Sequence, residues 1–269
     1  MQSGRYLYWI GIFTLVLIGA SGCGLSDYQS RMDAQRERVQ QFDEANRLLD
    51  DPVNVPKIEF QDPKETNPQQ KSAWPFDVFL RLPKGSGVSP KDNITFADNF
   101  VVFRYASFTP GAYNFFVAAA RIADDNQKEP EPGKYTRTGF LSYVKPAMDI
   151  YYANTYKIPA VLAQTTKVAS KEVKVVTAYP NPEAPATVKF SFFTYTDEAN
   201  TQVLAKDRSA FDVYYHEKAG KQLCLIVHRP LQSANAASLK TAIETSLGTL
   251  DLTSEVSKKR SEHRKAKSP

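Results

Sequence analysis

Apolar residues follow three different patterns along the chain, and each pattern predicts a different element. Tyr6–Ala20 is an unbroken run of apolar and small residues behind the positive charge of Arg5. Over residues 25–49, apolar residues recur at alternating three- and four-residue steps, which is typical of a heptad seam on a helix. Beyond Trp74 they alternate residue by residue in short stretches, which predicts strands with one buried face.

The heptad segment predicts one amphipathic helix over residues 26–49, about 36 Å long. Ser26 and Gln29 have the spacing of a capping box at its start. The eight seam positions, six of them apolar, are Leu25, Tyr28, Met32, Gln35, Val39, Phe42, Asn46 and Leu49. Two interpretations stay open: a coiled-coil stalk that forms a weak dimer, and a helix that lies against its own domain. Residues 27–51 contain four Arg and seven Asp/Glu, so the segment is acidic on balance. This charge argues against a helix lying flat on an anionic membrane.

Two polar segments frame the remaining chain. Asp51 and Pro52 are expected to stop the helix, and residues 52–73 contain four prolines among polar residues. This composition predicts an extended linker with one short strand at Lys57–Phe60. Residues 255–269 consist of Ser, Lys, Arg and Glu with few apolar residues, so they are predicted to be a disordered basic tail.

Residues 74–254 have the pattern of an α+β domain. Alternation, or β-branched and aromatic content, predicts about seven strands: Trp74–Leu82, Phe100–Tyr105, Tyr113–Ile122, Glu172–Tyr179, Thr187–Thr196, Phe211–His216 and Gln222–His228. The last two flank Lys218–Lys221, whose Gly220 favours a tight hairpin turn. Leu250 and Leu252 could add a final short strand.

Helical spacing occurs twice in this domain. Thr138–Asn154 has apolar residues three and four apart, with Pro146 as a kink or a late first-turn residue. Asn235–Leu247 has strict four-residue steps and is followed by Gly248 as a C-cap. We therefore expect a mainly antiparallel sheet with two packed helices, preceded by the long N-terminal helix. This order of elements resembles the PsbP/Mog1-type sandwich, which also occurs in bacterial lipoproteins; the resemblance implies a fold and no activity.

The first apolar run ends in Ala20-Ser21-Gly22-Cys23. As a helix its fifteen residues would reach about 22 Å, short of the ~30 Å hydrocarbon core, and this length matches the apolar region of a signal peptide. The ending resembles the lipobox of bacterial lipoproteins, although Ala20 stands where that family most often has Leu. An uncleaved signal anchor with an incidental cysteine is the alternative.

The lipobox resemblance implies a defined maturation. A diacylglycerol would be attached to the sulfur of Cys23, and signal peptidase II would cut between Gly22 and Cys23, so that residues 1–22 are the signal peptide. In some bacteria Asp after the cysteine retains the protein in the inner membrane. Gly24 stands at that position, so the outer membrane is favoured.

The charge of the chain lies at its two ends. The formal net charge is +5, of which Arg5 carries one unit and residues 255–269 carry four, so residues 23–254 are neutral. A neutral domain lacks the basic surface of nucleic-acid binders, and no nucleic-acid partner is predicted. The tail could still contact lipid headgroups, lipopolysaccharide or acidic wall polymers. Apolar residues at 42% and only two Cys are typical of a globular protein that is not a disulfide scaffold.

Few residues are candidates for catalysis. A two-residue turn at Ala219-Gly220 would pair His216 with Leu223 and His228 with Phe211, on opposite faces of the hairpin. A three-residue turn would instead place His216 opposite Cys224, and a Cys–His pair stays open on that register. Cys224 lies in an apolar strand, which favours a buried, inert thiol.

Other polar groups have simpler interpretations. Lys84–Gly87 is too short for a phosphate-binding loop and is predicted to be a turn, and Asp124, Asp125 and Asp149 have no visible partner and are assigned to a loop and a helix face. No motif for a metal, a cofactor or a nucleophilic serine is present in the sequence, so none is predicted. Surplus aromatic residues on the second face of the sheet could form a groove for a ligand or partner: Phe79, Phe193, Tyr195 and Tyr214.

These observations lead to an expectation with two alternatives. We expect a non-enzymatic cell-envelope lipoprotein whose α+β domain faces the periplasm and binds or supports an envelope protein or polymer. The first alternative is an accessory or assembly factor of a membrane protein complex, working through the aromatic face and the 26–49 helix. The second alternative is an enzyme with a site that no motif reveals.

Overall fold

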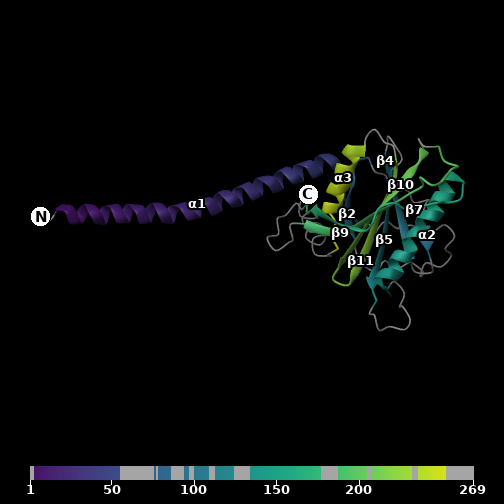
Figure 1. The fold of residues 1–269 in the computed structure, drawn as a ribbon, viewed down its shortest axis with the longest axis horizontal. Helices are drawn as coiled ribbons and strands as arrows, with labels where there is room; N and C mark the ends of the chain where they lie inside the picture. Colours follow the sequence, from purple (N-terminus) through teal and green to yellow (C-terminus); the bar gives the residue numbers. More distant parts are fainter. Residues whose placement is uncertain are drawn as a thin grey trace, which may run out of the picture. The chain divides into compact units, whose positions relative to one another are not determined.

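The computed structural model describes residues 3–54, 76, 78–85, 94–96, 100–108, 113–123, 134–176, 187–204, 207–231 and 236–252 (Figure 1). For residues 3–24, 53–54, 94–96, 100–108, 113 and 236–238 the description covers the backbone alone. Residues up to Arg47 belong to one compact unit, and the helices and strands that follow Leu48 belong to another. Each unit is described by itself.

The first unit consists chiefly of helix α1, which spans Ser3–Leu48. The expected long N-terminal helix is confirmed, and the predicted 26–49 segment lies within it except for its last residue. The capping box at Ser26 is not formed, because the helix begins upstream at Ser3 and continues through this position. In the described part of the chain, no helix combines the length and the apolar content needed to cross a membrane.

The chain after α1 forms a strand earlier than the composition suggests. Strand β1 (Leu49–Asn54) pairs antiparallel with β2 (Phe79–Pro83), so residues 52–54, which we assigned to the linker, belong to a strand. Pro52 is tolerated there because the register shifts between Leu49 and Pro52 and because β1 is an edge strand. The predicted strand at Lys57–Phe60 lies outside the described residues.

The Arg81 side chain fixes this register shift. Its Nε donates to the carbonyl oxygen of Asp50 at 2.8 Å, and its Nη2 donates to that of Leu49 at 3.1 Å. Arg81 is 8% exposed; its bond to Leu49 is buried, and its bond to Asp50 is partly buried. Two backbone carbonyls of the bulged strand are thereby satisfied by one guanidinium group.

The main sheet confirms the expected α+β class. Its order is β3 (Ile94–Phe96), β4 (Phe100–Phe108), β5 (Tyr113–Ile122), β11 (Lys221–Pro230), β10 (Ser209–Lys218), β9 (Thr187–Thr196) and β7 (Ala163–Gln164). Two further strands are β6 (Lys134–Tyr135), parallel to β5, and β8 (Ala169–Lys174), antiparallel to β9. All other pairs are antiparallel in the described residues, as expected.

The β10–β11 hairpin closes with a two-residue turn, one of the two turns that the sequence left open. Ala219 and Gly220 have φ values of 48° and 72°, the left-handed pair that matches the twist of a hairpin. Lys218 therefore pairs with Lys221, and the register continues in one-to-one steps to Ser209 and Pro230. The turn thus decides which side of the sheet every residue of the hairpin faces.

Helix α2 spans Arg137–Tyr156, and its two ends are capped by side chain and backbone. The hydroxyl of Thr136 accepts from the Gly139 N–H at 3.1 Å, and Lys157 closes the helix in the left-handed conformation with φ 59°. Pro146 lies well inside the helix, so it is not a first-turn residue. Proline has no N–H to donate to the Ser142 carbonyl one turn earlier. Both residues are exposed, so water can bond to that carbonyl instead.

Helix α3 spans Ala236–Gly248, close to the predicted range. Gly248 is the last helical residue rather than a left-handed cap; the next residue, Thr249, donates from its N–H and its hydroxyl to the Ser246 carbonyl at 2.9 and 2.7 Å. The expected final strand at Leu250 and Leu252 is reduced to a single bridge between Asp251 and Phe79.

The sheet is covered on both faces. One face packs against α2, and the other packs against β2 and α3 (Figure 1). We call these the α2 face and the α3 face. Strand alternation assigns residues to them: Phe190 and Leu225 lie on the α3 face, whereas Phe193 and Ile226 lie on the α2 face.

Candidate functional site

The two histidines of the hairpin lie on opposite faces, as the two-residue turn predicts. His216 pairs with Leu223 and His228 with Phe211. His216 is half-buried on the α3 face, where its ring is 5.3 Å from that of Phe190. His228 is 2% exposed on the α2 face. One metal ion therefore cannot bind both rings.

Cys224 is an inert core residue in this arrangement. It pairs with Tyr215, not with His216, so the register that would form a Cys–His pair does not occur. Its side chain is fully buried on the α2 face, and burial without a compensating charge raises the pKa of the thiol far above its usual range. A thiol with a raised pKa holds almost no thiolate near neutral pH and is a poor nucleophile.

Buried polar side chains converge around His228. Asn114 Nδ2 lies 2.9 Å from Tyr151 Oη and 3.1 Å from His228 Nδ1. On the other side of the ring, His228 Nε2 lies 3.3 Å from Tyr156 Oη, which is 2.9 Å from Ser209 Oγ. We call these five residues the His228 network; they join β5, β10, β11 and α2.

The network selects one tautomer of the imidazole. Asn114 carries its amide hydrogens toward His228, so Nδ1 must accept and cannot hold the proton. The proton then lies on Nε2, which donates to Tyr156 Oη, and the Tyr156 hydroxyl shares a second hydrogen bond with the Ser209 hydroxyl. His228 thus links Asn114 on one side of its ring to Tyr156 and Ser209 on the other.

A buried carboxyl group extends the His228 network. Asp197 is 0% exposed; its Oδ2 accepts from Tyr152 Oη at 2.7 Å, and its Oδ1 accepts from the Ser209 N–H at 2.9 Å. Burial, and then the Asp197 group, raises the pKa of Tyr152 well above its usual range. Burial also raises the pKa of Tyr156, so both phenols remain protonated donors.

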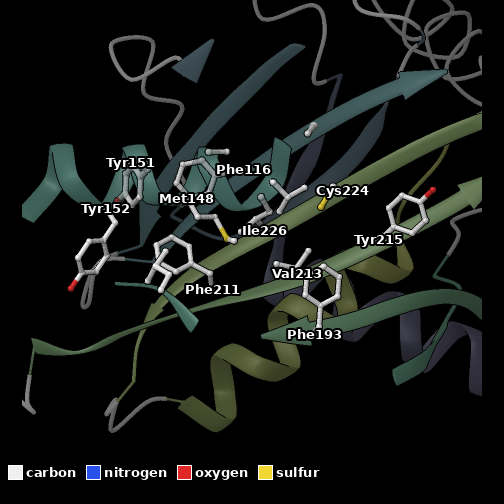
Figure 2. Close-up of a cluster of buried hydrophobic side chains, with 14 of the residues drawn as sticks. Phe116, Met148, Tyr151, Tyr152, Phe193, Phe211, Val213, Tyr215, Cys224 and Ile226 are labelled. Atoms are coloured by element: carbon white, nitrogen blue, oxygen red, sulfur yellow. The ribbon is translucent and has the colours of Figure 1, made fainter. Parts of the chain in front are cut away.

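Aromatic rings surround these polar groups. The His228 ring lies 4.7 Å from Phe211, 5.3 Å from Tyr151 and 6.2 Å from Tyr156 between centroids. Figure 2 shows Tyr151, Tyr152 and Phe211 gathered at one end of this cluster, with Met148 and Ile226 beside them. The arrangement holds α2 on the sheet by directed bonds as well as by apolar contact.

A small hollow opens beside the start of α2. Its volume is about 140 Å³, and its lining residues are Arg137, Ser170, Lys189, Phe190, Ser191, Tyr215 and Glu217. Arg137 Nη2 lies 3.2 Å from Ser191 Oγ, and its guanidinium carbon lies 5.1 Å from the centre of the Tyr215 ring. Arg137 Nε is also 3.6 Å from a carboxyl oxygen of Glu217. Because pockets for drug-sized ligands run from about 300 to 1,000 Å³, this hollow could hold a small polar group only.

The predicted aromatic groove is not formed. Tyr214 belongs to the core of the α3 face, whereas Phe193 and Tyr195 pack on the α2 face and Phe79 lies in β2. The prediction assumed one uncovered sheet face. Helices cover both faces, so the rings of Phe193, Tyr195 and Tyr214 belong to two separate cores.

Other predicted positions have these outcomes. Gly85 has φ 78° in a turn, and its N–H lies 3.2 Å from Asp50 Oδ2, which confirms the turn at its start. Asp149 has a partner after all, since Lys145 Nζ lies 2.7 Å from its Oδ2 one helical turn away. Asp124 and Asp125 lie outside the described residues. Gly22 and Cys23 lie in α1, where the backbone alone is described.

Sequence patterns did not identify Asn114, Asp197 or Arg137 as site residues. Arg137 directly follows the Thr136 cap, so a helix-start signal could have located it. Asp197 directly follows a strand, and its partners are 45 and 12 residues away. A contact at that separation leaves no local signal in one sequence.

No family model matches the chain, and no curated protein matches it. Two solved structures are similar to it at low identity. A protein from Bacteroides thetaiotaomicron VPI-5482 has 9% identity and a TM-score of 0.32; the match covers 66% of this chain and spans 46% of that protein. The Ran-binding protein Mog1p of Saccharomyces cerevisiae has 8% identity and a TM-score of 0.31 over 65% of this chain and 89% of its own. Similarity at this level assigns no function to the chain.

Proposed function

We propose that the chain is a cell-envelope lipoprotein, held in a membrane by acylation of Cys23, with a non-enzymatic α+β domain that faces the periplasm. The observation that carries the proposal is the position of Cys23. One of only two cysteines in 269 residues directly follows two small residues at the end of an apolar run of signal-peptide length.

The anchor would be strong enough to be permanent. Each buried CH₂ of an acyl chain contributes about 0.8 kcal/mol, and a single chain gives only marginal, reversible binding. The two or three chains of a mature lipoprotein would hold the protein in the bilayer without a membrane-spanning helix. Cleavage before Cys23 would also remove Arg5 and leave a neutral domain followed by the basic tail.

The buried chemistry of the domain supports a binding or structural role rather than catalysis. Cys224 and His228, which could act as a nucleophile and a base, are 0% and 2% exposed. The His228 ring is engaged on both nitrogens by Asn114 and Tyr156. A substrate would have to displace packed aromatic rings to reach either side chain.

The two ends of the mature chain indicate which partners the domain could reach. The acylated Cys23 would hold the domain close to a bilayer. Gly24, which stands where Asp would retain a lipoprotein in the inner membrane, favours the outer membrane. The tail of residues 255–269 carries +4 and is complementary to anionic headgroups, lipopolysaccharide or acidic wall polymers. Envelope polymers or proteins are therefore the proposed partners.

Metabolic labelling tests the anchor directly. In cells given labelled palmitate, the wild type and Cys224→Ala should carry the label, and Cys23→Ala should not. Globomycin, which blocks signal peptidase II, should cause a larger precursor of the wild type to accumulate. An unlabelled wild-type protein, or one whose size does not respond to globomycin, would contradict the proposal. Cys224→Ala is the matched control because it removes the only other thiol.

A further inference from the structure

Helix α1 carries exposed apolar side chains in one repeating pattern. Leu25 and Tyr28 are each 63% exposed, Met32 is 41% exposed and Val39 is 59% exposed. These residues, with Gln35, Phe42 and Asn46, occupy alternating three- and four-residue steps, and we call them the α1 seam. Four of the seven are exposed apolar side chains, Gln35 and Asn46 are exposed and polar, and Phe42 is half-buried, so the row forms a mainly apolar stripe rather than scattered exposed residues.

The residue types at the seam fit a second copy of the same helix. In heptad notation Leu25, Met32, Val39 and Asn46 are a positions, and Tyr28, Gln35 and Phe42 are d positions. Val39 is the one β-branched residue at a, the type that two-stranded coiled coils combine with Leu at d, and here the d positions hold Tyr, Gln and Phe instead; one Asn at a fixes register at a cost in stability. Leu49, the next d position, is 1% exposed in the sheet unit, so the pairing segment ends at Asn46.

The charges beside the seam allow a parallel pair in register. Arg38 at g would face the partner's Asp43 at e, which are opposite charges. Arg31 would face the partner's Arg36, a like-charged pair. Arg36 lies 3.8 Å from Asp33 on its own helix, which offsets part of that repulsion.

We propose that two copies of the lipoprotein pair in parallel through the α1 seam once both are tethered in the membrane. This inference rests on the proposed anchor at Cys23. Two copies whose acylated Cys23 residues lie in the same leaflet have both α1 helices pointing in the same direction. A seam of this length is marginal for a stable dimer in dilute solution. Tethering confines both copies to one surface and so raises their effective concentration, which favours even a weak pair.

Cysteine cross-linking in membranes that contain the full-length protein tests the pairing. Facing a positions of a parallel pair lie close enough for a disulfide, so Val39→Cys should form a covalent dimer under mild oxidation. Ser30→Cys, at an f position on the opposite side of the helix, is the matched control. Native Cys23 would be blocked by the lipid, and Cys224 is buried.

A second variant tests the seam without changing the reporter. Met32→Glu added to Val39→Cys should lower the cross-linked yield roughly tenfold, since it places two like charges in the apolar row. Ser30→Glu added to Val39→Cys should leave the yield unchanged. Both substitutions keep a good helix former in α1, so the contrast does not depend on unfolding.

The same samples separate the pairing from the anchor. Membrane-bound protein that cross-links equally at Val39→Cys and Ser30→Cys would overturn the pairing and leave the anchor intact. An adduct of Val39→Cys with a different protein would also overturn it. Protein recovered in the soluble fraction would overturn the anchor, and with it the parallel pairing that depends on the anchor.

Discussion

The two faces of the central sheet are closed by different kinds of interaction. The core of the α3 face is chiefly aliphatic, with Leu80, Leu225 and Leu247 each at most 1% exposed. The α2 face has many aromatic rings and, within them, the His228 network and Asp197. Apolar packing is non-directional, whereas hydrogen bonds in a dry environment require one geometry. Helix α3 is also held by directed bonds, such as the one from the Ser246 hydroxyl to the Arg81 carbonyl. On the α2 face, however, such bonds lie within the aromatic core, and the comparison indicates that there they help to specify where the helix sits.

Adjacent residues of β11 give the sharpest test of this difference. Leu225 on the α3 face and Ile226 on the α2 face are 0% and 1% exposed. We expect Leu225→Ala to lower the free energy of unfolding by about 4 kcal/mol and Ile226→Ala by about 2 kcal/mol. The smaller loss is expected because Met148, a flexible side chain in the same cluster, can move into part of the space.

Urea unfolding followed by circular dichroism measures both losses. Leu204→Ala, at a leucine that is 64% exposed, is the control and should change stability by less than about 0.5 kcal/mol. If Ile226→Ala lowered the free energy of unfolding as much as Leu225→Ala, the two faces would not differ in their response to a cavity left by a shortened side chain.

The polar side of the comparison depends on Asp197. Asp197→Ala removes the acceptor for two buried donors, the Tyr152 hydroxyl and the Ser209 N–H. Each unsatisfied donor costs about 1–3 kcal/mol, part of which local water can recover, so we expect a loss of about 2 kcal/mol in the free energy of unfolding. The measurement is the same urea titration.

Asp207→Ala is the matched control, because Asp207 lies in the same connection between β9 and β10 and is exposed. It should change stability by less than about 0.5 kcal/mol. A loss of similar size in both variants would show that the buried carboxyl group has no special part in holding α2.

The sequence predicted the elements of the sheet unit better than their partners. Thr187–Thr196 matches β9 at both ends, because its alternation is regular and polar residues bound it. The hairpin turn was also located from sequence, since Gly220 permits the positive φ of a tight turn, and the two-residue turn that forms is one of the two registers that the sequence left open. Both signals are local, and local signals survive in a single sequence.

Long-range contacts account for what sequence could not supply. Strand β1 contains Asp50, Asp51 and Pro52, which we assigned to the end of the helical segment and the start of the linker. Arg81, about 30 residues later, binds two carbonyls at the bulge of this strand. The two covered sheet faces were missed for the same reason. Alternation shows that Phe193 and Tyr214 point to opposite faces of the sheet. It cannot show that a helix packs on each of these faces.

The smallest expected effect concerns a polar group at the boundary of the α3 face. Desolvation is the main influence on His216 and lowers its pKa below the usual value of about 6.5. The hydrogen bond that its Nδ1 donates to the Lys189 carbonyl at 2.8 Å raises the pKa, but by less than burial lowers it. The unfolded chain therefore takes up this proton first as the pH falls. Stability should decline through and below about pH 6.5, whereas above it His216 is neutral in both states and has no effect on the slope.

His216→Gln keeps a donor for the Lys189 carbonyl and removes the titration. Its urea midpoint should fall less than that of the wild type between pH 7.5 and pH 5.5, and only slightly less because the ring is half-buried. His263→Gln, in the segment predicted to be a disordered tail, should follow the wild type. If all three proteins lost stability in parallel, burial of His216 would have no thermodynamic consequence, and the α3 face would be as indifferent to pH as its aliphatic core suggests.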